Sequence, residues 1–137
     1  MTTKFDLEAL YSEPNLGVLA TVNPDGQAHG MPIWYLYENG VFLISAGRKA
    51  QKVRNIERQG KATLIIDRRD LPYHAAMIQG RAEIGPGLDD AARLRLATRY
   101  LGEERGRAYS ANSSGSDSAT ITLHPDKVIE YTGTAGN

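Results

Sequence analysis

Basic side chains gather in one short part of this 137-residue sequence, between Arg48 and Arg69. Eight lysine and arginine residues lie there with only two acidic residues, although the whole chain carries 16 of each charge. At the centre of this region, segment 45–56 runs from a predicted strand end through Gly47 into a predicted helix. The unpaired N–H groups and positive dipole end of a helix start attract anions, and basic side chains in the first turns can close around a phosphate. The spacing alone is equally compatible with a solvated helix face whose cations contact only water.

Other chemical motifs are absent from the sequence. It contains no G-x-S-x-G, H-E-x-x-H, Walker or G-x-G-x-x-G pattern. It has no cysteine, and its histidines, His29, His74 and His124, lack partners at metal-ligand spacing, so we expect no metal site. The formal net charge of zero and the lack of a long apolar run argue against binding to nucleic acid or membrane. Because the first residues do not resemble a signal peptide, we expect a cytoplasmic protein.

The elements that position the basic segment begin with a short helix, for which Thr3 and Asp6 predict the N-cap. Two turn signals follow, at 23–26 and at Asn39-Gly40, and the second pair favours a type I′ turn. They separate three strands, which we predict to form a meander at 16–22, 28–37 and 41–44.

The rest of the chain continues this mainly β pattern. Apolar residues at three-residue spacing predict a helix of about ten residues ending at Gly60, and a second full helix from Asp89 to Gly102. The small, polar segment 110–118 predicts a mobile loop. The remaining strands are expected at 62–66, at 76–84 and, with a break after Pro125, at 119–131. Six strands with short helices favour a single α+β domain over residues 1–137, a six-stranded antiparallel split β-barrel.

Several segments between Asn15 and Tyr131 also follow one another in a recognisable order. They are strand 16–22 with the following Gly26, then segments 32–35, 52–56 and 79–82. In order and spacing they resemble the pyridoxamine 5′-phosphate oxidase-like superfamily, whose fold is the FMN-binding split barrel. Within it the chain is similar to the deazaflavin-dependent reductases of the B type, which use coenzyme F420.

The resemblance implies a set of cofactor contacts. Lys52 corresponds to the lysine that grips the cofactor phosphate. The other implied contacts lie near the phosphate or tail (Arg48, Gln51 and Arg54), along the tricyclic ring (Pro32, Ile33, Trp34, Ser45 and Ala46) and on a later strand (Gln79). Superfamily members are homodimers whose two cofactor sites lie at the subunit interface, so a homodimer with shared sites is implied here.

The function implied is that of an oxidoreductase dependent on reduced coenzyme F420 (F420H2), which transfers a hydride to an unsaturated small organic acceptor. Two alternatives stay open: an FMN-binding flavoprotein, and a non-catalytic carrier of flavin or deazaflavin. Excess positive charge favours the deazaflavin, because its polyglutamate tail is anionic and Arg48, Lys49, Arg68 and Arg69 could meet it. No residue is an evident general acid, and Tyr35, Tyr37 and His74 are the candidates.

Overall fold

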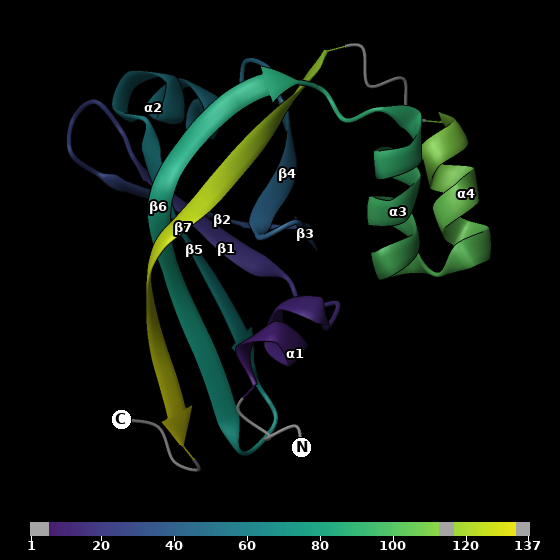
Figure 1. Ribbon diagram of the computed structural model, residues 1–137. Helices are drawn as coiled ribbons and strands as arrows, with labels where there is room; N and C mark the ends of the chain where they lie inside the picture. Colours follow the sequence, from purple (N-terminus) through teal and green to yellow (C-terminus); the bar gives the residue numbers. More distant parts are fainter. Residues whose placement is uncertain (1–5, 113–116, 134–137) are drawn as a thin grey trace.

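The computed structural model describes residues 6–112 and 117–133 and is built around one curved antiparallel sheet (Figure 1). Its seven strands lie in the order β2-β1-β5-β6-β7-β4-β3. The strands are β1 (Gly17–Val22), β2 (Ala28–Ile33), β3 (Leu36–Glu38), β4 (Val41–Gly47), β5 (Lys61–Arg68), β6 (Tyr73–Pro86) and β7 (Ser118–Gly133). The helices are α1 (Leu7–Ser12), α2 (Gln51–Gln59), α3 (Asp90–Leu101) and α4 (Glu103–Asn112). None of these helices is both long and apolar enough to cross a membrane.

The sheet has seven strands, and not the six predicted, because the strand expected at 28–37 is divided. Its first part, β2, pairs with β1, whereas its second part, β3, pairs with β4. These two parts form opposite edges of an open sheet, so the predicted three-strand meander is wrong. The division follows from burial: Tyr35 packs in the main core and the next residue, Leu36, in a second apolar cluster beside α3. Consecutive side chains of a strand point to opposite faces, and here each face has its own core to fill.

The longest hairpin, β6–β7, corrects a second prediction. We expected the last strand to break after Pro125, but β7 is continuous from Ser118 to Gly133. The pairing shifts at this point, from Gln79 opposite Lys127 to Gly80 opposite Pro125, which leaves Asp126 as the extra residue of a β-bulge. The bulge keeps the ladder intact while bending it. Asp126 also accepts a hydrogen bond from the N–H of Arg81 at 3.0 Å.

Most of the local signals in the sequence are confirmed. Asn39 and Gly40 both have positive φ angles, 54° and 77°, as a type I′ turn requires. Gly60 ends α2 in the left-handed conformation. The N-cap of α1 is Asp6, whose carboxylate accepts from the N–H of Glu8, whereas Thr3 lies outside the described residues.

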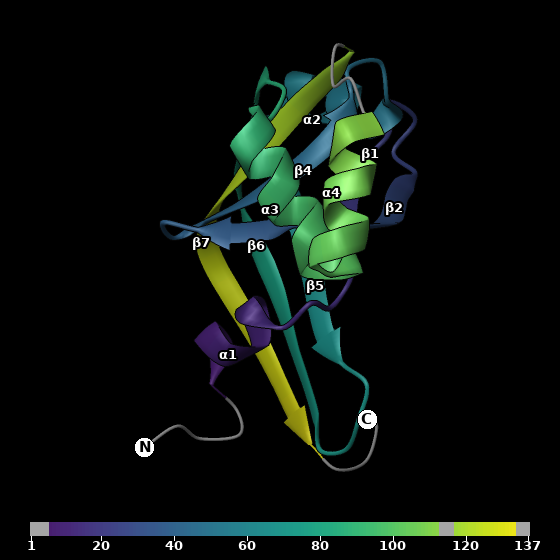
Figure 2. The same cartoon turned by 90° about the vertical axis from the view of Figure 1, so that its right-hand side faces the viewer.

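Helix α4 was not predicted, and it begins immediately after the expected end of α3. It includes residues 110–112 of the expected loop, whose residues 113–116 lie outside the described part, and Ser118 already belongs to β7. The helix lacks an apolar stripe and packs side by side with α3 (Figure 2). A Cβ atom added at Gly106 would lie 2.7 Å from the Cα of Thr98, so a glycine permits the close approach of the two helices.

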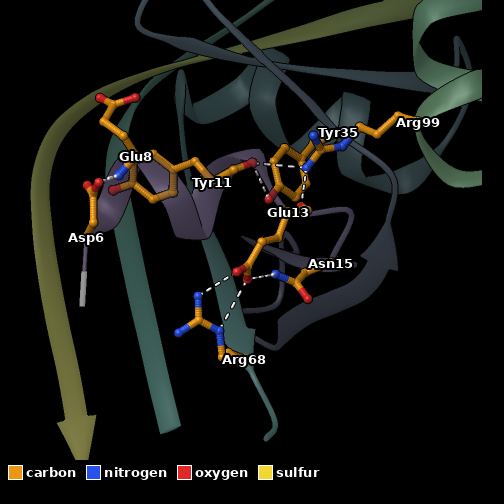
Figure 3. Close-up of polar contacts among 8 residues, drawn as sticks. All are labelled: Asp6, Glu8, Tyr11, Glu13, Asn15, Tyr35, Arg68 and Arg99. Atoms are coloured by element: carbon orange, nitrogen blue, oxygen red, sulfur yellow. Dashed lines mark hydrogen bonds and ion pairs between the residues drawn. The ribbon is translucent and has the colours of Figure 1, made fainter. Parts of the chain in front are cut away.

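A polar network joins α1, the link between β2 and β3 (residues 34–35) and α3 (Figure 3). The guanidinium of Arg99 donates 3.0 Å hydrogen bonds to the carbonyl oxygens of Tyr11 and Ser12 and lies 4.7 Å from the centre of the Tyr35 ring. The Tyr35 hydroxyl donates to the same Tyr11 carbonyl at 2.9 Å. The last backbone carbonyls of α1 therefore accept hydrogen bonds from Arg99 of α3 and from Tyr35, which lies between β2 and β3. These bonds hold Tyr35, the residue next to Trp34, in place.

Candidate functional site

One pocket lies between the sheet and the α3–α4 pair, and we call it the Trp34 pocket. Its volume is about 300 Å³. The sheet side of this pocket contains three of the predicted ring contacts, Ile33, Trp34 and Ser45. The other lining residues are Arg93, Leu96 and Ala97 of α3, Tyr109 of α4 and Ser118 of β7. The structure thus brings together residues separated by up to 85 positions in the sequence.

The indole of Trp34 is held by aromatic neighbours. It stacks on Tyr100 of α3, with ring centres 4.9 Å apart and ring planes 8° apart. Its ring centre also lies 5.5 Å from that of Tyr109. The Tyr100 hydroxyl accepts from the N–H of Tyr35 at 3.1 Å and donates to the carbonyl of Asn15 at 2.9 Å. This hydroxyl fixes Tyr100 to the backbone beside Trp34, so the pocket has a rigid aromatic wall.

The basic segment lies at the start of α2. Lys52, in the first turn, is half-buried and makes no hydrogen bond or ion pair with the other described residues. Burial lowers the pKa of its amine from the ordinary value, because desolvation disfavours the charged form. Gln51 and Arg54 line a shallow pocket of about 450 Å³ beside the β1–β2 turn. Arg48 is exposed and donates to the carbonyl of Ser118 at 2.9 Å, linking this segment to the rim of the Trp34 pocket.

Asn55, in the Lys52–Ile56 segment, has a structural role that the sequence did not reveal. Its side chain is fully buried, and its amide donates to Thr21 at 3.0 Å and to Asn23 at 2.9 Å. Its carbonyl oxygen accepts from Gln51 and Arg58. A buried side chain with every hydrogen bond made fixes the angle of α2 against β1, and therefore the position of Lys52. A polar residue among the buried positions of an otherwise amphipathic helix was the signal that could have indicated this role.

The other predicted contacts lie elsewhere in the protomer. Pro32 lines a pocket of about 730 Å³ with Arg68 and Arg69, and Gln79 lines one of about 610 Å³ with Lys61. The methyl group of Ala46 is buried in the main core, so only its backbone can face a ligand.

The candidate proton donors do not line the Trp34 pocket. Tyr35 is fully buried, and burial raises the pKa of its hydroxyl far above the ordinary value. The Tyr37 hydroxyl donates to Glu8 at 2.9 Å, and burial followed by this hydrogen bond raises its pKa. His74 is buried with Nε2 2.6 Å from Glu130. All three side chains make their contacts outside this pocket.

Comparison with known proteins identifies the family. Residues 4–131 match the family model described as pyridoxamine 5′-phosphate oxidase, and the chain therefore belongs to that family. The structural resemblance inferred from the sequence is confirmed. A comparison with curated protein sequences finds no match.

Solved structures share the fold. One described as an F420 reductase is 28% identical, with 94% of this chain and 98% of that chain covered and a TM-score of 0.75. The conserved hypothetical protein Rv2991 from Mycobacterium tuberculosis is 19% identical, with 96% and 86% covered and a TM-score of 0.76. HutZ, the heme storage protein from Vibrio cholerae, is 15% identical, with 99% and 98% covered and a TM-score of 0.69. The last two likenesses concern the fold alone.

Proposed function

We propose that the protein is a cytoplasmic reductase that uses F420H2 to deliver a hydride to an unsaturated small organic acceptor. The observation that carries the proposal is Lys52, a half-buried amine at a helix start with no partner among the described residues. A partly desolvated cation without a counter-charge is costly unless a ligand supplies one, and a ribityl phosphate supplies it. The likeness to an F420 reductase at 28% identity supports the choice of cofactor.

The residues present fit a planar, phosphate-bearing cofactor. Lys52, with Gln51 and Arg54 beside it, would hold the phosphate, and Trp34 and Ser45 would face the ring. Arg68 and Arg69 are ion-paired with Glu13 and Asp67, so Arg48 and Lys49, both exposed, are better placed to meet an anionic tail. When bound, the cofactor supplies the hydride, and the protein orients the ring and excludes water.

The proposal includes a homodimer, which an apolar row on the exposed face of the sheet supports. Strand register aligns five residues on one face across β2, β1, β5, β6 and β7: Pro32, Val18, Ile65, Met77 and Ile129. Ile65 and Ile129 are 36% and 42% exposed. A second copy would cover this row. Pro32 belongs to it and Gln79 lies two residues beyond Met77 on the same face, so both predicted contacts would then lie at the interface.

We expect the wild-type chain to sediment as a dimer, near twice its 15.0 kDa mass, at micromolar concentration. Ile65→Lys should sediment as a monomer, because it places a charge in the centre of the apolar row. Leu71→Lys is the control, since Leu71 is 62% exposed in the β5–β6 turn, outside the row, and should leave the dimer intact. A wild-type monomer that binds cofactor tightly would contradict the shared-site proposal.

Cofactor titration separates the proposal from the FMN alternative. We expect coenzyme F420 to bind the apo protein more tightly than FMN, with a gap that narrows as salt rises, because exposed cations hold the tail and salt screens them. Isothermal titration at two salt concentrations measures both affinities. Equal affinities at both concentrations would favour a flavin protein. Binding of F420 without turnover of F420H2 by any quinone or enone acceptor would favour a carrier.

A further inference from the structure

We propose that a basic pocket on the exposed face of the sheet binds a small multivalent oxyanion, either a compound with two or three carboxylates or a phosphate. The pocket has a volume of about 610 Å³. Three cations, each from a different strand, line it: Lys61 of β5, Arg81 of β6 and Lys127 of β7. We call it the Arg81 pocket. The inference goes beyond the proposed function, because neither Lys52 nor any residue of the Trp34 pocket lines it.

Strand pairing sets two of these cations directly against each other. Lys61 is the register partner of Arg81, and both residues are exposed. Residues directly opposite in an antiparallel pair have Cβ atoms about 4.5–5.5 Å apart, and like charges at such positions destabilise the sheet. The empty pocket therefore carries an unfavourable interaction. A bound anion would replace this repulsion with two attractions, because both cations can donate to it.

Neighbouring carboxylates do not neutralise the pocket. None of its three cations forms an ion pair with another described residue. Asp126 is the one carboxylate among the described lining residues, and its Oδ2 atom accepts from the backbone N–H of Arg81 at 3.0 Å. Glu83 follows Arg81 by two residues, but its carboxylate lies 2.6 Å from Nε2 of His124. The positive charge of the pocket thus exceeds what these carboxylates supply.

Neutral polar side chains lie beside the cations. Thr63 follows Lys61 by two residues and therefore lies on the same face of β5. Gln79 likewise shares its face of β6 with Arg81. Register pairs Gln79 with both Thr63 and Lys127, and all of these residues line the pocket. Hydroxyl and amide donors next to cations suit an anion that has several oxygen atoms.

The Arg81 pocket borders the apolar row of the proposed dimer. Ile65 lies two residues beyond Thr63 on β5, and Met77 lies two residues before Gln79 on β6. The exposed face therefore changes from apolar to basic within one step along each strand. An anion in the pocket would lie beside the second copy. It could come from solution, or it could be the anionic tail of a cofactor bound to that copy.

Titration of small anions into the cofactor-free protein tests the site. At low salt we expect wild type to bind citrate or inorganic pyrophosphate saturably in isothermal titration, and not to bind the monovalent acetate. Arg81→Gln should weaken this binding by about tenfold or more, the usual effect of losing a hydrogen bond between charged groups. Arg105→Gln is the control, because Arg105 is an exposed α4 arginine outside the pocket, and it should leave the affinity unchanged. Arg81→Gln should have the same effect in a Lys52→Met background, which excludes binding at Lys52 as its cause.

Urea denaturation shows whether the loss of binding comes from a damaged fold. At low salt Arg81→Gln should raise the denaturation midpoint of the apo protein, because it removes the repulsion between Lys61 and Arg81. The gain should shrink as salt rises, since salt screens exposed charges. No saturable binding of either probe to wild type, or equal losses of affinity in Arg81→Gln and Arg105→Gln, would overturn the inference.

A second titration, in saturating coenzyme F420, separates the two sources of the anion. If the ligand is a free anion, the affinity for citrate should be the same with and without F420. If the cofactor tail occupies the pocket, F420 should weaken citrate binding, and Arg81→Gln should bind F420 more weakly than wild type does. Failure of wild type to bind F420 would count against the proposed function alone, because the first titration needs no cofactor.

Discussion

Lys52→Met should weaken binding of coenzyme F420 by about ten- to a hundredfold in dissociation constant, the loss expected for a hydrogen bond to a charged group. Methionine keeps the aliphatic stem of the half-buried side chain and removes only the charge. The free energy of unfolding of the apo protein should stay the same or rise slightly, because the burial that lowers the pKa of the Lys52 amine also penalises its charge in the empty site. Isothermal titration gives the affinity, and urea denaturation gives the stability.

Lys61→Met is the matched control for this prediction. Lys61 is exposed at the start of β5, beyond the opposite end of the nine-residue helix α2, which is about 13 Å long. A direct phosphate contact predicts that the Lys52 effect is several times larger than the Lys61 effect and persists at high salt, since partly buried pairs are screened less than exposed ones. Matching losses in the two variants, falling together with salt, would remove the phosphate site from Lys52.

Gly80→Ala should lower the free energy of unfolding by about 3 kcal/mol or more, the range of severe overpacking. A Cβ atom at Gly80 would lie 1.8 Å from the carbonyl oxygen of His124, 2.9 Å from its carbonyl carbon and 3.0 Å from the amide nitrogen of Asp126. All three atoms belong to the β7 backbone at the bulge. They cannot move aside as a flexible side chain would, so the bulge must open or the two strands must separate. Urea denaturation measures the loss.

Gly85→Ala provides the comparison on the same strand. A Cβ atom there meets nothing within 4 Å, and the φ angle of Gly85 is not positive. The substitution should change the free energy of unfolding by no more than about half a kcal/mol. Equal stability of the two variants would contradict the close approach of the β6 and β7 backbones at Gly80. If only Gly80→Ala is destabilised, the close approach of the β6 and β7 backbones requires the glycine of the Gln79–Ala82 segment. The family resemblance of that segment then reflects the fold more than cofactor binding.

The Lys52–Ile56 segment, which also supports the family resemblance, likewise contains both residues that build the fold and residues that can face a ligand. In this stretch Val53, Asn55 and Ile56 are buried and attach α2 to the sheet, while Lys52 and Arg54 stay accessible. The sequence indicates all of these residues together as one motif. The structure separates those that build the helix position from those that face a ligand.

Local chemistry was enough to predict the features that depend on neighbours in the chain. The Asn39-Gly40 turn, the end of α2 at Gly60 and the alternating faces of β6 were all readable from the sequence, and the structure confirms them. Positive φ angles favour glycine and asparagine wherever they occur, and a half-buried strand needs a period of two whatever its partners are. The mainly β class and the position of the basic segment followed from such rules.

Tertiary contacts decided the rest. The division of the strand at Trp34–Tyr35 depends on two cores on opposite faces of the sheet, and α4 depends on close packing against α3 at Gly106. Neither leaves a periodic signal in its own segment. The Trp34 pocket likewise joins Ser45 of β4 to Arg93 of α3. Ser45 and Arg93 are 48 positions apart in the sequence, so a pocket that contains both could be read only from the folded chain.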